Sequence, residues 1–314
     1  MLDNYIRAFV GYSNNISTRL NGSSGGVGTE IFEYLLNQKI VDGVIGVGYG
    51  ETDVAKPIYK YIDLATDVSK LSGSKYVFMG YKELVSIIEQ YQDKKIVVVC
   101  QPCFSAVLRK KFKNIEYIIS FFCGYNIGYD ATEYLLKKSN IDIKDIQNIN
   151  YRGGKYPGGF TVYKKNGEVK TFGKQYYELV DLMFLRKGCD ACGFYISDNA
   201  DIVLGDAWLK NITSTSLILV NSNKANNLLR SLFNDNRVTL SNIRKEDIFR
   251  MHKHNIKYKK YGHSKIMSFI VKIFNSKYAP IILPFYILGF ISKIRRMFAI
   301  GITAKFKEII KYNE

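Results

Sequence analysis

The stretch that decides the fold class is IVVVCQPC, at residues 96–103. Its apolar half does not alternate with polar residues, which is typical of a strand that is buried on both faces, as in a parallel sheet. Residues 117–122 repeat this pattern and lead directly into Cys123, and helical patterns follow the two runs at residues 104–112 and 130–138. Alternating strands and helices predict an α/β sheet with right-handed crossovers, in which ligands collect at the carboxyl ends of the strands.

A loop of small residues opens the N-terminal part of the chain. Ser23, Ser24, Gly25 and Gly26 stand just before an amphipathic helix that is expected at residues 30–36. Free backbone N–H groups at a helix start suit a phosphate, and the same serines and glycines also suit a plain helix cap. Both interpretations stay open on the sequence alone.

The rest of the N-terminal half is expected to continue the alternation. A strand is expected at residues 41–47, and the glycines at 46, 48 and 50 are interpreted as a turn at its end, because they do not complete a dinucleotide-binding fingerprint. A charged linker that runs to Asp67 and a helix at residues 82–92 follow.

After residue 150 the pattern changes to glycine-rich loops and short strands. A basic glycine loop at residues 152–159 precedes two strands, at 160–164 and 168–172, which are joined by an Asn-Gly turn. This dipeptide is a strong hairpin signal. One more strand is expected at residues 216–220.

Two carboxylates and the only tryptophan lie close together after this hairpin. Asp201 and Asp206 flank a short apolar run, and Trp208 follows it. Paired carboxylates could serve acid–base chemistry, but turn and capping roles are the commoner outcome. Trp208 is expected in the core.

These elements together predict an α/β fold: a mixed open sheet with flanking helices, a region that contains a β-hairpin, and a basic helical tail. The expected division is residues 1–150, residues 151–235 of the same catalytic unit, and a partly amphipathic extension at residues 236–314.

Five cysteines stand in a chain whose first 25 residues contain no apolar secretion signal, so metal or redox chemistry is favoured over disulfides. Four thiolates in a tetrahedral arrangement bind zinc or an iron–sulfur cluster, and spacing alone does not separate the two. Cys100 ends an apolar strand and is expected to be structural, whereas the polar surroundings of Cys189 and Cys192 favour a ligand role. The other two cysteines are Cys103 and Cys123.

Histidine and charge are unevenly distributed. Residues 1–251 contain no histidine, which disfavours a Ser-His-Asp or Cys-His hydrolase. The net charge is +17, and residues 251–314 hold 13 Lys and Arg residues against two acidic ones. A basic tail predicts an acidic partner surface, such as anionic lipid or nucleic acid. Apolar residues at every fourth position from Ile294 to Phe306 predict a helix that lies in a membrane interface.

The hydropathy of the sequence indicates where in the cell the protein is expected. No run reaches 18 apolar residues, so no transmembrane helix is expected. A cytoplasmic protein is expected, whose tail could contact the inner face of the membrane.

The order of several short motifs resembles one protein family. Each motif is modest alone, and the ordered set covers about residues 8–230. The motifs are Ser23–Gly26, Gly73–Tyr76, Pro102-Cys103, Phe122-Cys123, the Arg152–Gly158 loop, Cys189-x-x-Cys192 and Ala200–Trp208. With them the chain resembles the coenzyme F-420 hydrogenase/dehydrogenase beta-subunit family, of the bacterial type found among polysaccharide-biosynthesis genes. The resemblance implies a flavoprotein that binds FAD and a 4Fe-4S cluster and transfers electrons between the cluster, the flavin and a second carrier.

The resemblance also implies which residues hold the cofactors. The cluster ligands would be Cys103, Cys123, Cys189 and Cys192, with Cys100 as the spare cysteine. Residues 151–235 would then form a cluster-binding region.

Residues 1–150 would hold the flavin. The loop Ser24–Gly26 would meet the pyrophosphate, and the positive charge of Lys75 would stabilise the reduced anionic flavin. Arg152 and Lys155 would face an anionic group of the flavin or of the substrate.

Two functions are compatible with these patterns. The first is a flavin/iron–sulfur oxidoreductase that acts on an external carrier or a glycan-pathway substrate and takes electrons from ferredoxin, a reduced deazaflavin or a nicotinamide. The alternative is a zinc-stabilised binding module whose basic tail, with Tyr258–Tyr261 as an example, binds nucleic acid or membrane. The confinement of the charge to the tail disfavours nucleic acid.

Overall fold

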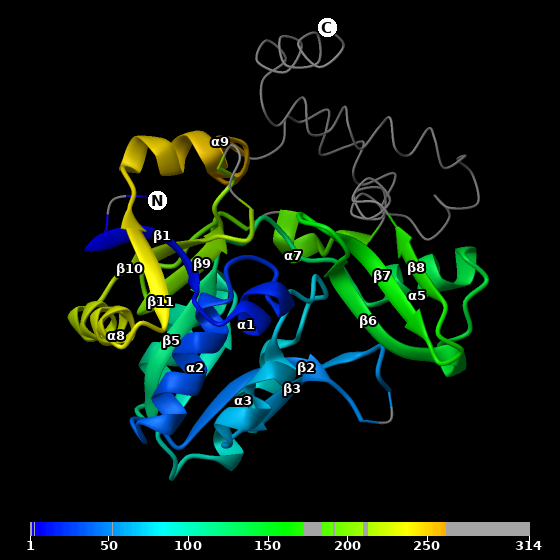
Figure 1. Ribbon diagram of the computed structural model, residues 1–314, viewed down its shortest axis with the longest axis horizontal. Coiled ribbons are helices and arrows are strands. Elements are labelled where there is room, and N and C mark those ends of the chain that lie inside the picture. Colours follow the sequence, from blue (N-terminus) through cyan, green and yellow to red (C-terminus); the bar gives the residue numbers. More distant parts are fainter. Residues whose placement is uncertain are drawn as a thin grey trace, which may run out of the picture.

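The main sheet has eight strands in the part of the chain that the computed structural model describes, which is residues 2, 4–51, 53–172, 184–190, 192–209 and 213–261. In chain order they are β1 (Arg7–Ser13), β2 (Gly43–Tyr49), β3 (Pro57–Ile62), β4 (Ile96–Cys100), β5 (Ile115–Phe121), β9 (Ile202–Asp206), β10 (Ser216–Val220) and β11 (Val238–Asn242). Their spatial order is β11-β1-β10-β9-β5-β4-β2-β3 (Figure 1). The central strands β2, β4, β5 and β9 are parallel, and the outer pairings are antiparallel. The expected mixed open α/β sheet is therefore confirmed.

Helices cover both faces of this sheet. One face packs against α2 (Val27–Asn37) and α8 (Asn223–Asn234). The other face packs against α3 (Tyr81–Gln90), α4 (Pro102–Lys111) and α9 (Lys245–Tyr261). Along β4, Val97 and Val99 belong to the first core whereas Ile96 and Val98 belong to the second. The prediction that this strand is buried on both faces is thus confirmed.

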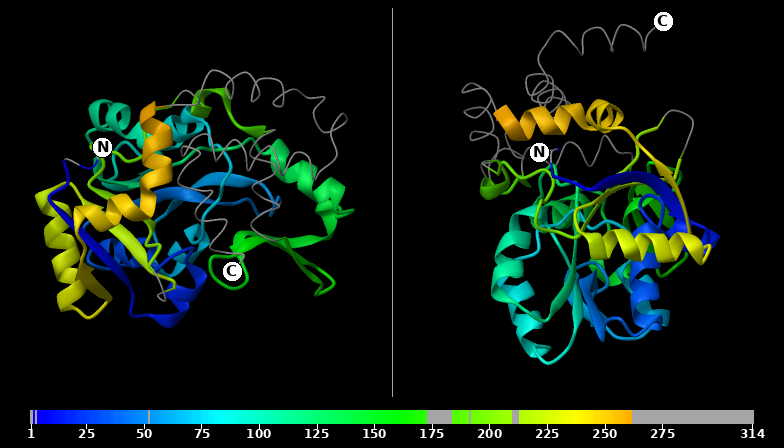
Figure 2. Two further views of the ribbon diagram at one scale, coloured as in Figure 1. Left: turned by 90° about the horizontal axis from the view of Figure 1, so that it is seen from above. Right: turned by 90° about the vertical axis from the view of Figure 1, so that its left-hand side faces the viewer.

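A smaller sheet lies to one side of the main sheet (Figures 1 and 2). Its strands, in the order β6-β7-β8, are β6 (Ile146–Gly153), β7 (Gly159–Lys164) and β8 (Val169–Phe172). It shares a third core with α5 (Asp130–Lys138), in which Tyr151, Phe160 and Leu135 are buried. The predicted hairpin is confirmed, because β7 pairs with β8 in antiparallel register across a turn in which Gly167 has φ 86°.

Two interpretations of the N-terminal half are wrong. The expected charged linker contains β3, which pairs with β2, and the short helix η1 (Ala65–Leu71). Gly46 and Gly48 lie inside β2 rather than in a turn after it. A Cβ atom at Gly46 would lie 3.0 Å from a side-chain carbon of Leu71, so η1 packs closely over these glycines. Local charge does not reveal an edge strand, because an edge strand keeps polar side chains on its exposed side.

The remaining short helices are α1 (Ile16–Asn21), η2 (Ile143–Asp145) and α7 (Lys187–Asp190). The domain division stays a prediction. Its first boundary falls inside β6, its second region contributes β9 and β10 to the main sheet, and β11 pairs with β1 after its second boundary. Residues 262–314, which include the expected interfacial helix, lie outside the described residues.

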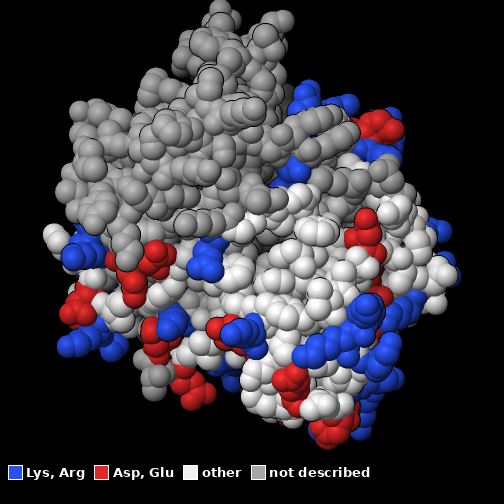
Figure 3. All heavy atoms as spheres, turned by 180° about the vertical axis from the view of Figure 1, so that it is seen from behind, with Lys and Arg blue, Asp and Glu red and all other residues white. Residues whose placement is uncertain are grey.

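The described surface carries charged side chains of both signs (Figure 3). Figure 3 shows basic and acidic side chains next to one another on the face it presents. Among the described residues, no helix has the length and apolar character needed to cross a membrane.

Candidate functional site

A cavity of about 690 Å³ lies where the carboxyl ends of the parallel strands meet the smaller sheet. Many separate parts of the chain contribute to its wall, including the loop before α2, the segment after η1, the ends of β4, β5, β6 and β9, and the middle of α9. The polar and charged side chains among the lining residues include Ser23, Ser24, Lys75, Arg152, Asp206, His252, His254 and Asn255. Its position agrees with the rule that ligands of open α/β sheets bind at the carboxyl edge.

The glycine loop fits closely between the first strands. Gly26 is the N-cap of α2 and has φ 75°, a left-handed conformation that favours glycine. A Cβ atom at Gly25 would lie 2.5 Å from the carbonyl oxygen of Gly11 and 2.8 Å from the backbone nitrogen of Ser216. The backbone therefore approaches its neighbours as closely as a glycine allows, and the start of an eleven-residue helix faces the cavity.

Lys75 lines the same cavity. Its Nζ donates hydrogen bonds to the carbonyl oxygens of Leu71, at 3.0 Å, and Ser72, at 2.7 Å. Burial lowers the pKa of Lys75 to about 7. Among the described residues no carboxylate forms an ion pair with this ammonium group, so its charge is directed to backbone oxygens and to the cavity.

Arg152 is held by a carboxylate that the sequence interpretation assigned to turns and caps. Its Nη1 donates to Asp206 Oδ1 at 2.9 Å and to Oδ2 at 2.7 Å, and its Nε donates to the Pro157 carbonyl at 2.8 Å. The Ser24 hydroxyl also donates to Asp206. Asp206 therefore connects the glycine loop to the smaller sheet, and it is a site residue that sequence reasoning missed.

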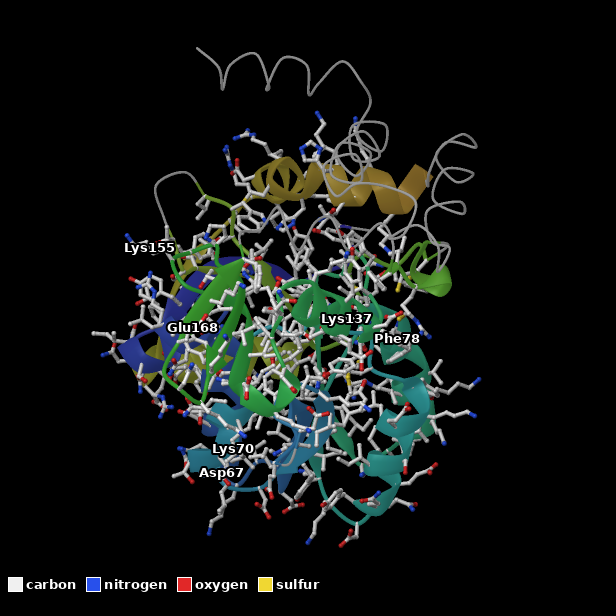
Figure 4. All side chains as sticks on the ribbon, turned by 90° about the vertical axis from the view of Figure 1, so that its right-hand side faces the viewer. Asp67, Lys70, Phe78, Lys137, Lys155 and Glu168 are labelled. Atoms are coloured by element: carbon white, nitrogen blue, oxygen red, sulfur yellow. The ribbon has the colours of Figure 1, made fainter. Side chains whose placement is uncertain are left out.

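Two other polar residues that the sequence analysis considered, Lys155 and Asp201, do not line the cavity. Lys155 is exposed and is not among the residues that line the cavity; Figure 4 shows it at the outer edge of the smaller sheet. Its contact with an anionic group stays a prediction. Asp201 is buried and accepts hydrogen bonds from Arg109, from the Ile118 backbone and from the Ser222 hydroxyl, which is a structural role.

Trp208 does not belong to the core. Its side chain is 40% exposed, lines the cavity and lies 6.0 Å from the ring of Tyr156, centroid to centroid. The Arg152 guanidinium is 5.8 Å from the Trp208 ring centroid. The expectation of a core tryptophan is wrong, because the loop after β9 carries the indole out along the cavity wall.

His252 closes the cavity from the side of α9, a segment that the sequence interpretation treated as the beginning of a basic tail. The residue is 4% exposed, and its ring stacks on Phe122 at 4.7 Å. His252 Nε2 lies 3.1 Å from the Asp206 carbonyl oxygen, which can only accept, so Nε2 carries the proton. The Tyr195 hydroxyl then donates to Nδ1 at 2.7 Å. Burial lowers the pKa of His252 to about 4, which keeps the imidazole neutral.

The four predicted cluster ligands come from three separate segments and lie near one another. Cys103 is in the first turn of α4, Cys123 follows β5, and Cys189 and Cys192 lie in and after α7. Burial raises the pKa of the Cys103 thiol to about 11 and that of Cys123 to about 12. Cys189 and Cys192 raise both pKa values further, and Cys103 also raises that of Cys123.

The described cysteines are spaced more widely than the ligands of a single metal ion. In the described part of the chain, no three His, Cys, Asp or Glu residues are arranged closely enough to hold a metal ion. Cys100 is 2% exposed within the second core, as its strand context predicts. Its structural role and the ligand roles of the other four stay predictions.

Two family models match the chain in sequence. Residues 8–86 match the model for the N-terminal part of the coenzyme F420 hydrogenase/dehydrogenase beta subunit, and residues 93–246 match the model for its C terminus. The observed fold is of the α/β class that the resemblance predicts, and the cavity lies at the carboxyl edge of its sheet. The chain belongs to the coenzyme F420 hydrogenase/dehydrogenase beta-subunit family.

Two curated relatives come from Methanocaldococcus jannaschii. The coenzyme F420-dependent sulfite reductase of Methanocaldococcus jannaschii is 30% identical over 207 residues, which are 59% of this chain and 31% of that protein. The F420-dependent formate dehydrogenase subunit beta of the same organism is 30% identical over 190 residues, or 58% of this chain and 48% of that protein. The chain therefore spans about a third of the length of the first of these relatives and about half of the second.

One solved structure extends the likeness to the fold. The chain is similar to a chain of the F420-reducing [NiFe] hydrogenase complex of Methanosarcina barkeri, with a TM-score of 0.65 and 18% identity. The match covers 84% of this chain and 92% of that one.

Proposed function

We propose that this protein is a flavin/iron–sulfur oxidoreductase, which passes electrons between a 4Fe-4S cluster, FAD and an external carrier. The observation that carries the proposal is the proximity of the two candidate sites. The backbone N–H of Cys123 donates to the Tyr195 carbonyl at 2.8 Å, and Tyr195 and Phe122 both contact His252 in the wall of the cavity. Cys123 itself lines the cavity beside Phe122 and Tyr195, so the cysteine group adjoins the cavity directly.

The residues of the cavity fit a flavin. The glycine loop at the start of α2 presents backbone N–H groups to the diphosphate of a dinucleotide, and the cradle around Gly25 has no room for a side chain. Lys75 holds a positive charge beside the bound group. Asp206 already balances the charge of Arg152. We therefore propose that Arg152 helps to form the cavity wall and does not bind an anion.

The donor set of the cysteine group fits an iron–sulfur cluster. Four thiolates are the usual ligands of a 4Fe-4S cluster. Cys103 is exposed and Cys189 and Cys192 are half-buried, so these thiols are accessible for the assembly of a cluster. The two cofactors would supply one-electron transfer at the cluster and two-electron transfer at the flavin. The residues beside Cys123 position the two groups and exclude water: His252 is buried, and its ring stacks on the partly buried Phe122 at 4.7 Å.

The partner and the substrate class follow from this role. A chain with these two cofactors needs an electron donor, and we propose ferredoxin or a reduced deazaflavin or nicotinamide carrier. The family relationship favours a coenzyme F420-dependent reaction, since the names of the curated relatives include it. A glycan-pathway substrate is a second acceptor class to be tested.

The test is anaerobic purification followed by a UV–visible spectrum and assays of flavin, iron, sulfide and zinc on one sample. Flavin bands with about four iron and four sulfide per chain are expected. Cys103→Ser and Cys189→Ser should lower the iron content, whereas the matched variant Cys100→Ser should retain it. A colourless protein with one zinc ion and no flavin after reconstitution would contradict the proposal and support the zinc-stabilised module instead.

A further inference from the structure

The buried face of α9 carries two polar residues. Its buried side chains recur at helical spacing, namely Ile248, His252, Ile256 and Lys259, and each is at most 7% exposed. A lysine is almost never buried to this extent unless it is paired. His252 faces the cavity, and Lys259 lies two turns further along the same face. Most of α9 lies beyond residue 246, where the family match ends.

Lys259 lies against the loop that holds two of the cysteines. Its Nζ donates to the carbonyl oxygen of Cys189 at 3.4 Å. A Cβ atom at Gly193 would lie 3.7 Å from the Lys259 carbonyl oxygen, and one at Gly124 would lie 3.8 Å from the side-chain oxygen of Asn255. Thus α9 packs directly on the residues that follow Cys123 and Cys192.

The loops that carry the cysteines lie beside a buried cation. Lys259 is 7% exposed, and its Nζ is within hydrogen-bond distance of the Cys189 carbonyl oxygen. The same helix packs on Gly193, directly after Cys192, and on Gly124, directly after Cys123. The ammonium group is therefore held next to the segments that carry three of the four predicted ligands.

We propose that Lys259 is the counter-charge of the cysteine group and raises the reduction potential of the cluster that this group binds. The inference rests on the proposed function and goes beyond it, because it assigns control of the reduction potential of the cluster to a residue of α9. One electron passes from the external one-electron carrier to the cluster, with no bond made or broken, and adds one negative charge. A cation held in a region of low dielectric stabilises the reduced form more than the oxidised form. Because α9 also carries His252, the same helix adjusts the cluster and closes the flavin cavity.

The test is a potentiometric titration of the full-length protein, monitored by electron paramagnetic resonance of the reduced cluster. Lys259→Met should shift the one-electron equilibrium toward the oxidised cluster by about tenfold, which corresponds to a midpoint about 59 mV more negative. Lys259→Arg keeps the charge and should stay near the wild type. Lys253→Met removes an exposed charge six residues earlier on the same helix and is the matched control.

The outcomes separate the inference from the function on which it rests. A wild-type midpoint in Lys259→Met at full iron content overturns the inference and leaves the oxidoreductase intact. Loss of iron in both Lys259→Met and Lys259→Gln, with retention in Lys259→Arg, supports the counter-charge through cluster retention. Loss of iron in Lys259→Arg as well overturns the inference, because a positive charge at this position would then not be sufficient to retain the cluster. Absence of iron and sulfide from the reconstituted wild type contradicts the proposed function itself.

Discussion

Arg152 Nη1 donates to both carboxylate oxygens of Asp206, at 2.9 and 2.7 Å, and this ion pair joins the smaller sheet to the main sheet. Arg152 is the second-last residue of β6 and Asp206 is the last of β9, so the pair bridges strands that share no backbone hydrogen bond. The side chains are 7% and 17% exposed, so solvent screens the pair only weakly.

We expect Asp206→Ala to lower the free energy of unfolding by about 3–5 kcal/mol, because it leaves the buried Arg152 charge without a partner. The double variant Arg152→Met/Asp206→Leu should recover part of this loss. Urea denaturation of the protein without cofactors provides the measurement. The matched control is Glu168→Ala, which breaks the surface pair Lys164–Glu168 (Figure 4) and should leave stability nearly unchanged. Equal effects of the two single variants would contradict a structural role of the buried pair.

The Lys75 charge makes flavin binding depend on pH. Burial lowers the pKa of Lys75 to about 7 in the protein without flavin, so the ammonium is present below that pH and is lost above it. Because an anionic diphosphate prefers the charged form, the dissociation constant of FAD should increase as the pH rises through 7, by at most about tenfold per pH unit. Fluorescence titration at pH 6–9 measures it.

Two variants test this assignment. Lys75→Met should bind FAD more weakly at pH 6 and should remove most of the pH dependence. Lys70→Met, which removes an exposed lysine that pairs with Asp67, should keep the wild-type profile (Figure 4). A pH profile that Lys75→Met leaves unchanged would assign the dependence to another group.

His252 makes the protein sensitive to acid. Burial lowers the pKa of His252 to about 4, below the unfolded value of about 6.5. In this pH interval the unfolded chain binds a proton that the native protein excludes, so the free energy of unfolding should fall between pH 6.5 and pH 4 by about 3 kcal/mol from this residue. In His252→Gln this part of the decrease should be missing, and Gln can still donate to the Asp206 carbonyl. The exposed His254→Gln is the control, and equal acid profiles of His252→Gln and the wild type would refute the assignment.

Gly25 is required for the loop by close packing rather than by chemistry. Gly25→Ala places a methyl group within 2.5 Å of the Gly11 carbonyl oxygen, so we expect a large loss of stability and of FAD affinity. Gly28→Ala adds the same group inside α2, 3.1 Å from a side-chain carbon of Leu204 that can move, and should be tolerated. Thermal unfolding and FAD titration of both variants decide this, and similar behaviour of the two would mean that the cradle is not tight.

Local pattern was sufficient for much of the fold. The unbroken apolar runs of β4 and β5 predicted parallel strands buried on both faces, since burial on two sides leaves no position for polar residues. The Asn-Gly turn predicted the β7–β8 hairpin for a similar local reason. By contrast, β1 and β11 were not predicted, because edge and antiparallel strands depend on partners more than 200 residues away in the sequence.

The residue pattern alone was therefore enough to predict an α/β sheet, a glycine loop before a helix, and cysteines of metal-binding type. The three-dimensional contacts were needed to show that Asp206 meets Arg152 and Ser24, and that the start of the apparent basic tail is a helix with His252 and Lys259 on its buried face. The physical reason is that charge and periodicity report which residues share a face of one element. What that face packs against is set by contacts between elements, whose free energy depends on the whole chain.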